Sequence, residues 1–398
     1  MIIPSRASAA LLLAGCGAPE PEFHGETEVV VGERVTLEVL RGDGFGETPE
    51  FGLEDGAGAT FSGADVDLAS DGNVLSFRVP AGIASGSVSV RAGPYAFDLD
   101  VRRLAVGVAK GGAVALRDAA GEIYFDAEAK LQSSRVRVGA DGATVALVSR
   151  EPGAVQVFDL TRDPPAASIG RIDFAEEVRD AVVVGDRLCV ALPRGLCIVR
   201  LGDAPALEGC TGGDMRGVAA GPDDDSAYAA GAIDCDVGVR ACDGLIRVNL
   251  GVVPVVPAAT WILDEAPGGV VALAVGDEAA LIVDVDGAEA ALRAVSLGAL
   301  NVASMPLTPD LAGGLAAAGG GRFLVGGATA FAEATFADGV PSLGAAAPMT
   351  RTIVGLALTR AGDAFVGFSD GFGRADLAAG SVEPLGEWIE AIGFGVQP

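Results

Sequence analysis

Short runs of alternating apolar and polar residues, separated by clusters of Gly, Asp and Pro, extend along most of this chain. In residues 28–40 (EVVVGERVTLEVL), Val35, Leu37 and Val39 fall on one face of an extended segment, which is the period-two pattern of a half-buried strand. Residues 73–93 (NVLSFRVPAGIASGSVSVRAG) give two more strands around a Pro-Ala-Gly turn. The pattern predicts that residues 27–102 form a small β-sandwich.

From residue 103 onward, the chain repeats a unit of three apolar strands separated by Gly/Asp turns. The third strands end near Phe125, Leu160, Leu201, Leu250, Leu297, Phe336 and Leu377. Their average spacing of about 42 residues matches the four-stranded blade of a β-propeller. We therefore expect residues 103–398 to form a propeller of seven blades, with six or eight as alternatives. Residues 104–110 (LAVGVAK) and 388–396 (WIEAIGFGV) are expected to pair and seal the ring, because closure removes exposed sheet edges.

Two resemblances agree with this all-β organisation. The words GDGFGETPEFG (residues 42–52) and SFRVPAGIASGSVSVRAG (residues 76–93) resemble the TIG-type immunoglobulin-like domain. This resemblance implies an immunoglobulin-like sandwich that serves as a spacer or a binding module and carries no chemistry. The repeats from residue 103 onward resemble β-propellers with degenerate, YVTN-like repeats, in overall shape rather than in a signature.

The N-terminus carries an apolar run followed by small residues and a cysteine. The block Leu13-Ala14-Gly15-Cys16 resembles the lipobox of bacterial lipoproteins. The resemblance implies that residues 1–15 are a signal peptide and that Cys16 is lipidated and anchors the chain. Gly17 rather than Asp follows the cysteine, which implies the outer membrane. An ordinary secretory signal with an incidental cysteine is the alternative. Residues 16–26 lack apolar periodicity and are expected to form an extended tether.

Charge limits the partners of the chain. It has 27 Lys and Arg against 54 Asp and Glu, giving a formal net charge of −27. A surface of this sign repels nucleic acid, so we exclude nucleic acid as a partner. The expected membrane contact is made through lipid on Cys16.

Five further cysteines lie between residues 189 and 242. Clustered cysteines in an exported protein usually form disulfides. Cys235 and Cys242 are expected to staple an insertion in the fourth blade. If residues 202–205 form a turn with Leu201 opposite Ala206, Cys197 falls opposite Cys210, which leaves Cys189 free. A Cys189–Cys197 bond is the alternative.

The sequence contains few residue patterns typical of a catalytic site. The sole histidine, His24, lies in the predicted tether, so a Ser-His-Asp, Cys-His or His-based zinc site in the propeller is excluded. Asp234, Asp236 and Asp243 flank the fourth-blade cysteines and are weak cation candidates. A surface loop stapled for stability is the favoured explanation of this segment.

The combined pattern predicts a lipid-anchored envelope protein without cofactor. Its propeller would act as a non-enzymatic platform that binds protein or glycan. The alternative is a carboxylate- or calcium-dependent propeller enzyme, such as a hydrolase, lyase or lactonase. An enzyme of this kind needs several carboxylates converging on the central channel, whereas a platform does not.

Overall fold

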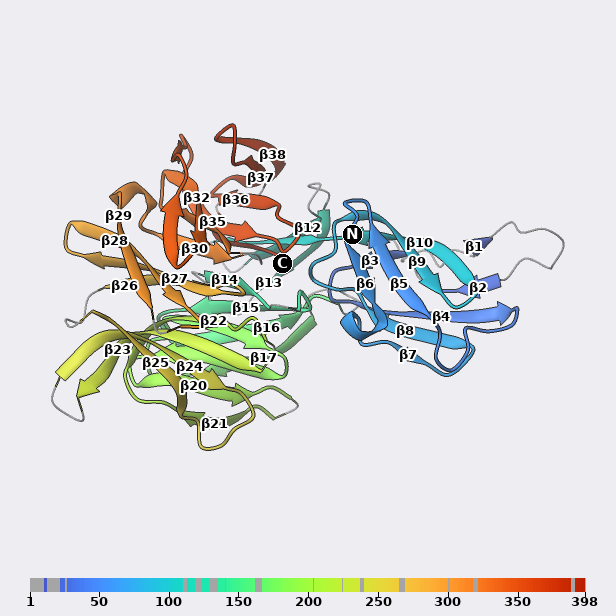
Figure 1. Cartoon of the computed structure of the whole chain (residues 1–398), viewed down its shortest axis with the longest axis horizontal. Helices are drawn as coiled ribbons and strands as arrows, with labels where there is room; N and C mark the ends of the chain where they lie inside the picture. Colours follow the sequence, from blue (N-terminus) through green and yellow to red (C-terminus); the bar gives the residue numbers. More distant parts are fainter. Residues whose placement is uncertain are drawn as a thin grey trace. The chain divides into compact units, whose positions relative to one another are not determined.

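Strands dominate the computed structural model of this chain (Figure 1). The structure describes residues 11–12, 22–25, 27–109, 113–118, 123–128, 135–139, 141–161, 167–202, 204–223, 225–236, 240–264, 269–299, 301–317, 321–387 and 391–397. The predicted all-β class is confirmed. The described helices are two single 3₁₀ turns, η1 (Gly63–Asp65) and η2 (Pro309–Leu311). Within the described residues, no helix has the length and apolar character needed to cross a membrane.

The chain divides into two compact units, Met1–Leu104 and Ala105–Pro398. Among its described residues, the first unit contains two five-stranded sheets. One has the order β1 (Leu11–Leu12), β2 (Glu22–His24), β4 (Arg34–Arg41), β8 (Val74–Arg78), β7 (Ala69–Ser70). The other has the order β3 (Glu28–Val30), β10 (Tyr95–Arg102), β9 (Gly86–Ala92), β5 (Phe51–Asp55), β6 (Thr60–Ser62).

Both sheets of the first unit contribute to one apolar core. Val35, Leu37 and Val39 of β4 are buried and alternate with exposed residues, as the sequence pattern predicts. Phe77 of β8 and Leu99 of β10 belong to the same core, so the unit is a β-sandwich. Within the segment predicted to be a tether, Glu22–His24 pairs with β4 as a strand.

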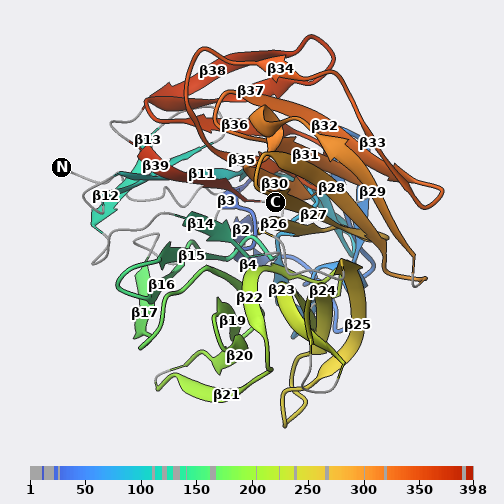
Figure 2. The same ribbon diagram turned by 90° about the vertical axis from the view of Figure 1, so that its left-hand side faces the viewer.

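The second unit contains seven antiparallel sheets among its described residues, each built on four strands (Figure 2). The first sheet has the order β39 (Ala391–Val396), β11 (Leu104–Ala109), β12 (Ala113–Asp118), β13 (Ile123–Glu128). The second is β14 (Arg135–Val138), β15 (Thr144–Ser149), β16 (Ala154–Asp159), β17 (Ala167–Asp173). The third is β18 (Asp180–Val184), β19 (Arg187–Leu192), β20 (Gly195–Arg200), β21 (Ala206–Cys210).

The remaining four sheets follow in chain order. The fourth is β22 (Asp214–Ala220), β23 (Ser226–Asp236), β24 (Arg240–Asn249), β25 (Pro257–Asp264). The fifth is β26 (Val270–Val275), β27 (Ala279–Asp286), β28 (Glu289–Ser296), β29 (Val302–Leu307). The sixth is β30 (Gly314–Ala317), β31 (Arg322–Gly326), β32 (Ala330–Ala337), β33 (Val340–Leu343), with β34 (Ala347–Pro348) on β32. The last is β35 (Ile353–Leu358), β36 (Ala364–Phe368), β37 (Gly371–Asp376), β38 (Ser381–Glu387).

The first strands of these sheets form a closed ring. β14 contacts β18, β18 contacts β22, and the contacts continue through β26, β30 and β35 to β39, which contacts β14. This ring of radially arranged sheets is a β-propeller. β39 pairs antiparallel with β11, so the ring is sealed by the pairing that the sequence predicts.

Neighbouring sheets bury their apolar faces against each other. One core joins Val155 and Val157 of β16 to Val190 of β19, and another joins Leu281 of β27 to Phe323 of β31.

The close approach of neighbouring first strands at the ring centre requires small residues. A Cβ on Gly395 of β39 would lie 3.1 Å from a methyl group of Val136. A single sheet cannot shelter both of its faces, so stability depends on the complete ring.

Candidate functional site

The central cavity of the second unit is the candidate site. It has a volume of about 450 Å³ and is lined by residues from the first strand of each of the seven sheets. Most of the lining consists of Val, Ala, Leu and Gly. A concave, mainly apolar cavity with a few polar groups is the usual form of a small-molecule site.

Arginines provide most of the charge in the cavity lining. Arg135 and Arg137 lie two residues apart on β14, so their side chains point to the same side of the strand. Arg360 and Asp277 line the cavity beyond the ends of β35 and β26. Among the described lining residues, the carboxylate is supplied by Asp277.

Asp180, the first residue of β18, links the two arginines to the next sheet. Its side chain is fully buried. Arg137 donates through Nε to Oδ1 at 3.0 Å and through Nη2 to Oδ2 at 2.8 Å. Arg135 Nη1 lies 3.5 Å from Oδ2, and the N–H groups of Ala181 and Val218 also donate to the carboxylate. The group is therefore a bidentate, charge-assisted clamp between adjacent sheets.

The clamp keeps Asp180 ionised although it is buried. Burial opposes ionisation, but the charges of Arg137 and Arg135 and the hydrogen bonds from Arg137 and Val218 outweigh it and lower the pKa of Asp180. The charge of Asp180 in turn raises the pKa of Arg137. Two guanidinium groups thus face one buried carboxylate at the edge of the cavity.

The sequence interpretation did not identify this cluster. Its local signals are the charged positions of the segment RVRV (residues 135–138) and an Asp before the apolar run AVVV (residues 181–184). Arg137 and Asp180 are 43 residues apart and meet only because neighbouring first strands are adjacent in the ring.

The predicted cation candidates lie elsewhere, on the β23–β24 hairpin. Asp234 is exposed, and Asp243 is 1% exposed. The side chain of Asp236 and all of Cys16 lie outside the described residues. No group of three or more His, Cys, Asp or Glu side chains suited to a metal occurs in the described part of the chain.

The structure contains the two disulfides that the sequence favours, Cys197–Cys210 and Cys235–Cys242. Cys197 and Cys210 are direct cross-strand partners on β20 and β21. The neighbouring register differs from the prediction, because Arg200 rather than Leu201 pairs with Ala206. A bulge between Ile198 and Val199 restores the cysteine alignment.

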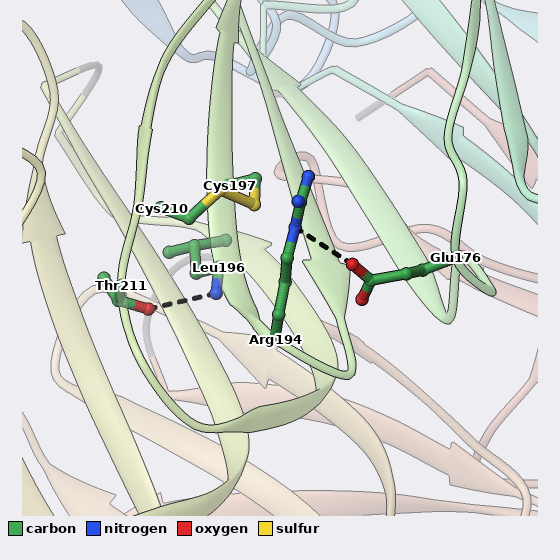
Figure 3. Close-up of a disulfide and its surroundings, with 6 residues drawn as sticks. All are labelled: Glu176, Arg194, Leu196, Cys197, Cys210 and Thr211. Carbon is green, nitrogen blue, oxygen red and sulfur yellow. Dashed lines mark hydrogen bonds and ion pairs between the residues drawn. A yellow bond between two sulfur atoms is a disulfide. The ribbon is translucent and has the colours of Figure 1, made fainter.

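Further contacts fix the chain around the Cys197–Cys210 bond (Figure 3). Leu196 N–H donates to Thr211 Oγ1 at 3.0 Å, and Arg194 forms an ion pair with Glu176 at 3.3 Å.

Cys189 is free and buried. Burial, only partly offset by the charge of Arg187, raises the pKa of its thiol to about 12. Such a thiol is not a nucleophile near neutral pH.

The β23–β24 hairpin extends past the other strands of its sheet. Pairing with β22 reaches Ala232, and pairing with β25 reaches Asp243. Beyond these residues β23 and β24 pair only with each other, as far as Asp236 and Arg240, and the Cys235–Cys242 bond links them. Because Asp214 begins β22 opposite Ala232, the extension lies at the end of the ring where first strands begin.

Comparisons with known proteins find similarity to solved structures at low sequence identity. No family model and no curated protein matches the chain. A functionally unknown protein from Desulfotomaculum acetoxidans superimposes with a TM-score of 0.54 at 11% identity, covering 74% of this chain and 98% of that one. Apo AztD from Citrobacter koseri gives 0.46 at 14% identity, covering 73% and 83%. The Cps50 (Swd1) β-propeller domain from Myceliophteria thermophila gives 0.44 at 10% identity, covering 70% and 94%.

Proposed function

We propose that this chain is a lipid-anchored protein of the bacterial outer membrane whose propeller is a non-enzymatic platform for a protein or glycan partner. Cys16 carries the lipid, and residues 1–15 are removed as a signal peptide. The first unit is an immunoglobulin-like spacer, and the second is a propeller of seven blades. The seven sheets in ring order support the blade number, and the two-sheet core supports the sandwich.

The observation that carries the binding role is the stapled β23–β24 hairpin. Residues 233–236 and 240–242 extend past both neighbouring strands and are cross-linked by Cys235–Cys242. A pair of strands joined by a disulfide loses less entropy on binding than an unlinked pair. The extension therefore offers a preorganised contact surface at one end of the ring.

The lining of the central cavity supports a role without catalysis. A calcium- or carboxylate-dependent enzyme needs several oxygen ligands pointing into one space. The described lining instead consists mainly of small apolar side chains, with arginines as its main charged groups. Cations at this position repel a metal ion.

Capture of a partner by the full-length, membrane-anchored protein tests the platform role. We expect affinity purification from the native envelope to recover one partner in stoichiometric amount. Replacing residues 234–241 by Asn-Gly, together with Cys242→Ala, shortens the hairpin to a tight turn and is expected to abolish recovery. Val253→Ser, an exposed site at the other end of the same sheet, is the matched control. Equal recovery with the shortened hairpin would remove the hairpin from the proposal.

Calcium separates the platform from the enzyme alternative. A ligand that binds the folded state raises the melting temperature. Because a platform needs no calcium site, we expect millimolar calcium to leave the melting temperature of the purified chain unchanged. Saturable stabilisation by calcium would favour the enzyme.

Cys16→Ser tests the anchor. We expect this variant to leave the membrane fraction and to lose labelling by fatty acid. Cys189→Ala, the control, should keep both the membrane location and the labelling.

A further inference from the structure

The side chain of Arg135 lies across the central channel of the second unit. Arg135 is the first residue of β14, and its Nη2 donates to the carbonyl oxygen of Val271, near the start of β26, at 3.5 Å. In the ring of first strands, β14 is followed by β18, β22 and then β26. Three steps is the largest separation that a ring of seven strands allows. Arg135 therefore reaches from one wall of the channel to the opposite wall.

The same guanidinium group is held from a second direction. Its Nη1 is buried and lies 3.5 Å from Oδ2 of Asp180 on β18, the neighbour of β14. A planar guanidinium group has N–H donors that point in several directions, so it can hold a carboxylate on one side and a carbonyl oxygen on the other. Arg137 keeps Asp180 in place through hydrogen bonds of 2.8 and 3.0 Å. Arg135 is thus attached to three first strands, β14, β18 and β26.

The position of this contact along the channel determines which end it closes. Arg135, Asp180 and Val271 all lie at or near the beginning of their strands. The cavity of about 450 Å³ is also lined by Asp277 and Arg360, which follow the ends of β26 and β35. Arg360 is exposed. The contact therefore crosses one end of the cavity, and Arg360 marks the other.

We propose that Arg135 is a crossbar that closes the central channel at the end where the first strands begin. The cavity is then a pocket with a single opening, and small solutes enter it from the opposite end, past Arg360. A side chain that crosses a pore sets its width, and a guanidinium group also repels cations. The β23–β24 hairpin lies at the closed end, so a macromolecule bound to the hairpin leaves the opening free. The crossbar does not depend on the partner or the lipid anchor proposed above.

Thiol labelling inside the cavity tests the crossbar on the full-length chain. Ala316→Cys places a reporter thiol on β30, where Ala316 is half-buried and lines the cavity. Arg360→Cys adds a thiol at the opening, which is capped first with a polyethylene-glycol maleimide too bulky to enter the cavity. We expect this cap to slow iodoacetamide labelling at position 316 at least about tenfold, because the reagent then depends on local opening of the ring. A matched cap on Val340→Cys, an exposed site on the outer strand β33, should leave the rate unchanged. Mass spectrometry of the isolated peptide measures the labelling.

Removal of the crossbar should cancel the effect of the cap. With Arg135→Ala, we expect labelling at position 316 to be as fast with the cap at position 360 as without it, because the reagent then enters from the other end. Arg171→Ala, on the outer strand β17, is the control and should keep the slowing.

The comparison of the two caps needs no change at Arg135, so it tests the closed end even if Arg135→Ala fails to fold. Equal labelling under the two caps would show that the channel is open at both ends. A cap effect that persists in folded Arg135→Ala would show that another group closes the channel. Either result overturns the proposal.

Discussion

Gln397 donates a side-chain hydrogen bond from Nε2 to the carbonyl oxygen of Gly142, a residue 255 positions earlier in the chain. Gly142 lies between β14 and β15, while Gln397 directly follows β39. Gln397 is fully buried. The last strand of the chain is thus attached on two sides, by pairing with β11 and by this contact with the next sheet.

Removal of β39 should therefore open the ring. We expect a chain ending at residue 390 to lose cooperative unfolding, because the β11 sheet loses its first strand and the β14 sheet loses a packing partner. Gln397→Ala, which removes the hydrogen bond to the carbonyl oxygen of Gly142, should cost about 1–2 kcal/mol. A chain ending at residue 397 serves as the control. Circular dichroism during heating follows the unfolding of the two shortened chains and of Gln397→Ala. A cooperative transition without β39 would contradict closure of the ring by this strand.

Loss of the Asp180 carboxylate should destabilise the ring between its second and third sheets. Asp180→Asn leaves two arginines facing a neutral group, and we expect a loss of about 3 kcal/mol in the free energy of unfolding. Asp173→Asn, an exposed ion-pair residue, should change stability by less than about 0.5 kcal/mol. Urea unfolding at pH 7 compares the two. Equal effects would show that the clamp adds nothing to stability.

The same variant gives a pH dependence with a defined sign. The pKa of Asp180 is lowered in the folded state, whereas it is about 3.9 in an unfolded chain. Ionisation of Asp180 therefore stabilises the fold fully above about pH 4, and this contribution is lost as pH falls further. The difference in stability between the unaltered chain and Asp180→Asn should be constant from pH 5 to pH 8 and narrow below about pH 4. A constant difference down to pH 2 would contradict this assignment.

The strands and their partners along the chain could be predicted because their signals are local. Val35, Leu37 and Val39 alternate with polar residues, and each was found on the buried face of its strand. Cys197 and Cys210 could be paired from the length of one turn. Even there the register at Ala206 was wrong by one residue, because the bulge beside Ile198 has no distinct sequence signal.

Contacts between sheets could not be predicted in the same way. The clamp depends on which first strands are neighbours and on which faces of Arg137 and Asp180 meet, and neither is set by local alternation. The metal candidates show the converse: residues close in sequence need not share an environment. Asp234 and Asp243 are close in sequence, but one is exposed and the other is buried, so proximity along a hairpin did not predict a shared environment.

The two disulfides should contribute differently to stability. Cys197–Cys210 links β20 to β21 within a sheet and closes a loop with a sequence separation of 13. We expect Cys197→Ala with Cys210→Ala to cost about 3 kcal/mol and to speed hydrogen exchange in β21. Cys235→Ala with Cys242→Ala should speed exchange mainly in the hairpin extension, because that segment pairs only with itself. Exchange mapped by mass spectrometry tests both, and unchanged exchange in β21 would contradict the first expectation.

Cys189 should be protected from thiol reagents in the folded chain. Burial raises the pKa of its thiol to about 12, so at pH 8 only about one thiol in ten thousand is ionised. We expect iodoacetamide to leave Cys189 unmodified in the native state and to modify it rapidly in denaturant, as measured on the isolated peptide by mass spectrometry. The same peptide map distinguishes the observed Cys197–Cys210 bond from a Cys189–Cys197 bond. Labelling of native Cys189 at the rate seen in denaturant would show that the thiol is accessible and that the core around β19 is looser than the structure indicates.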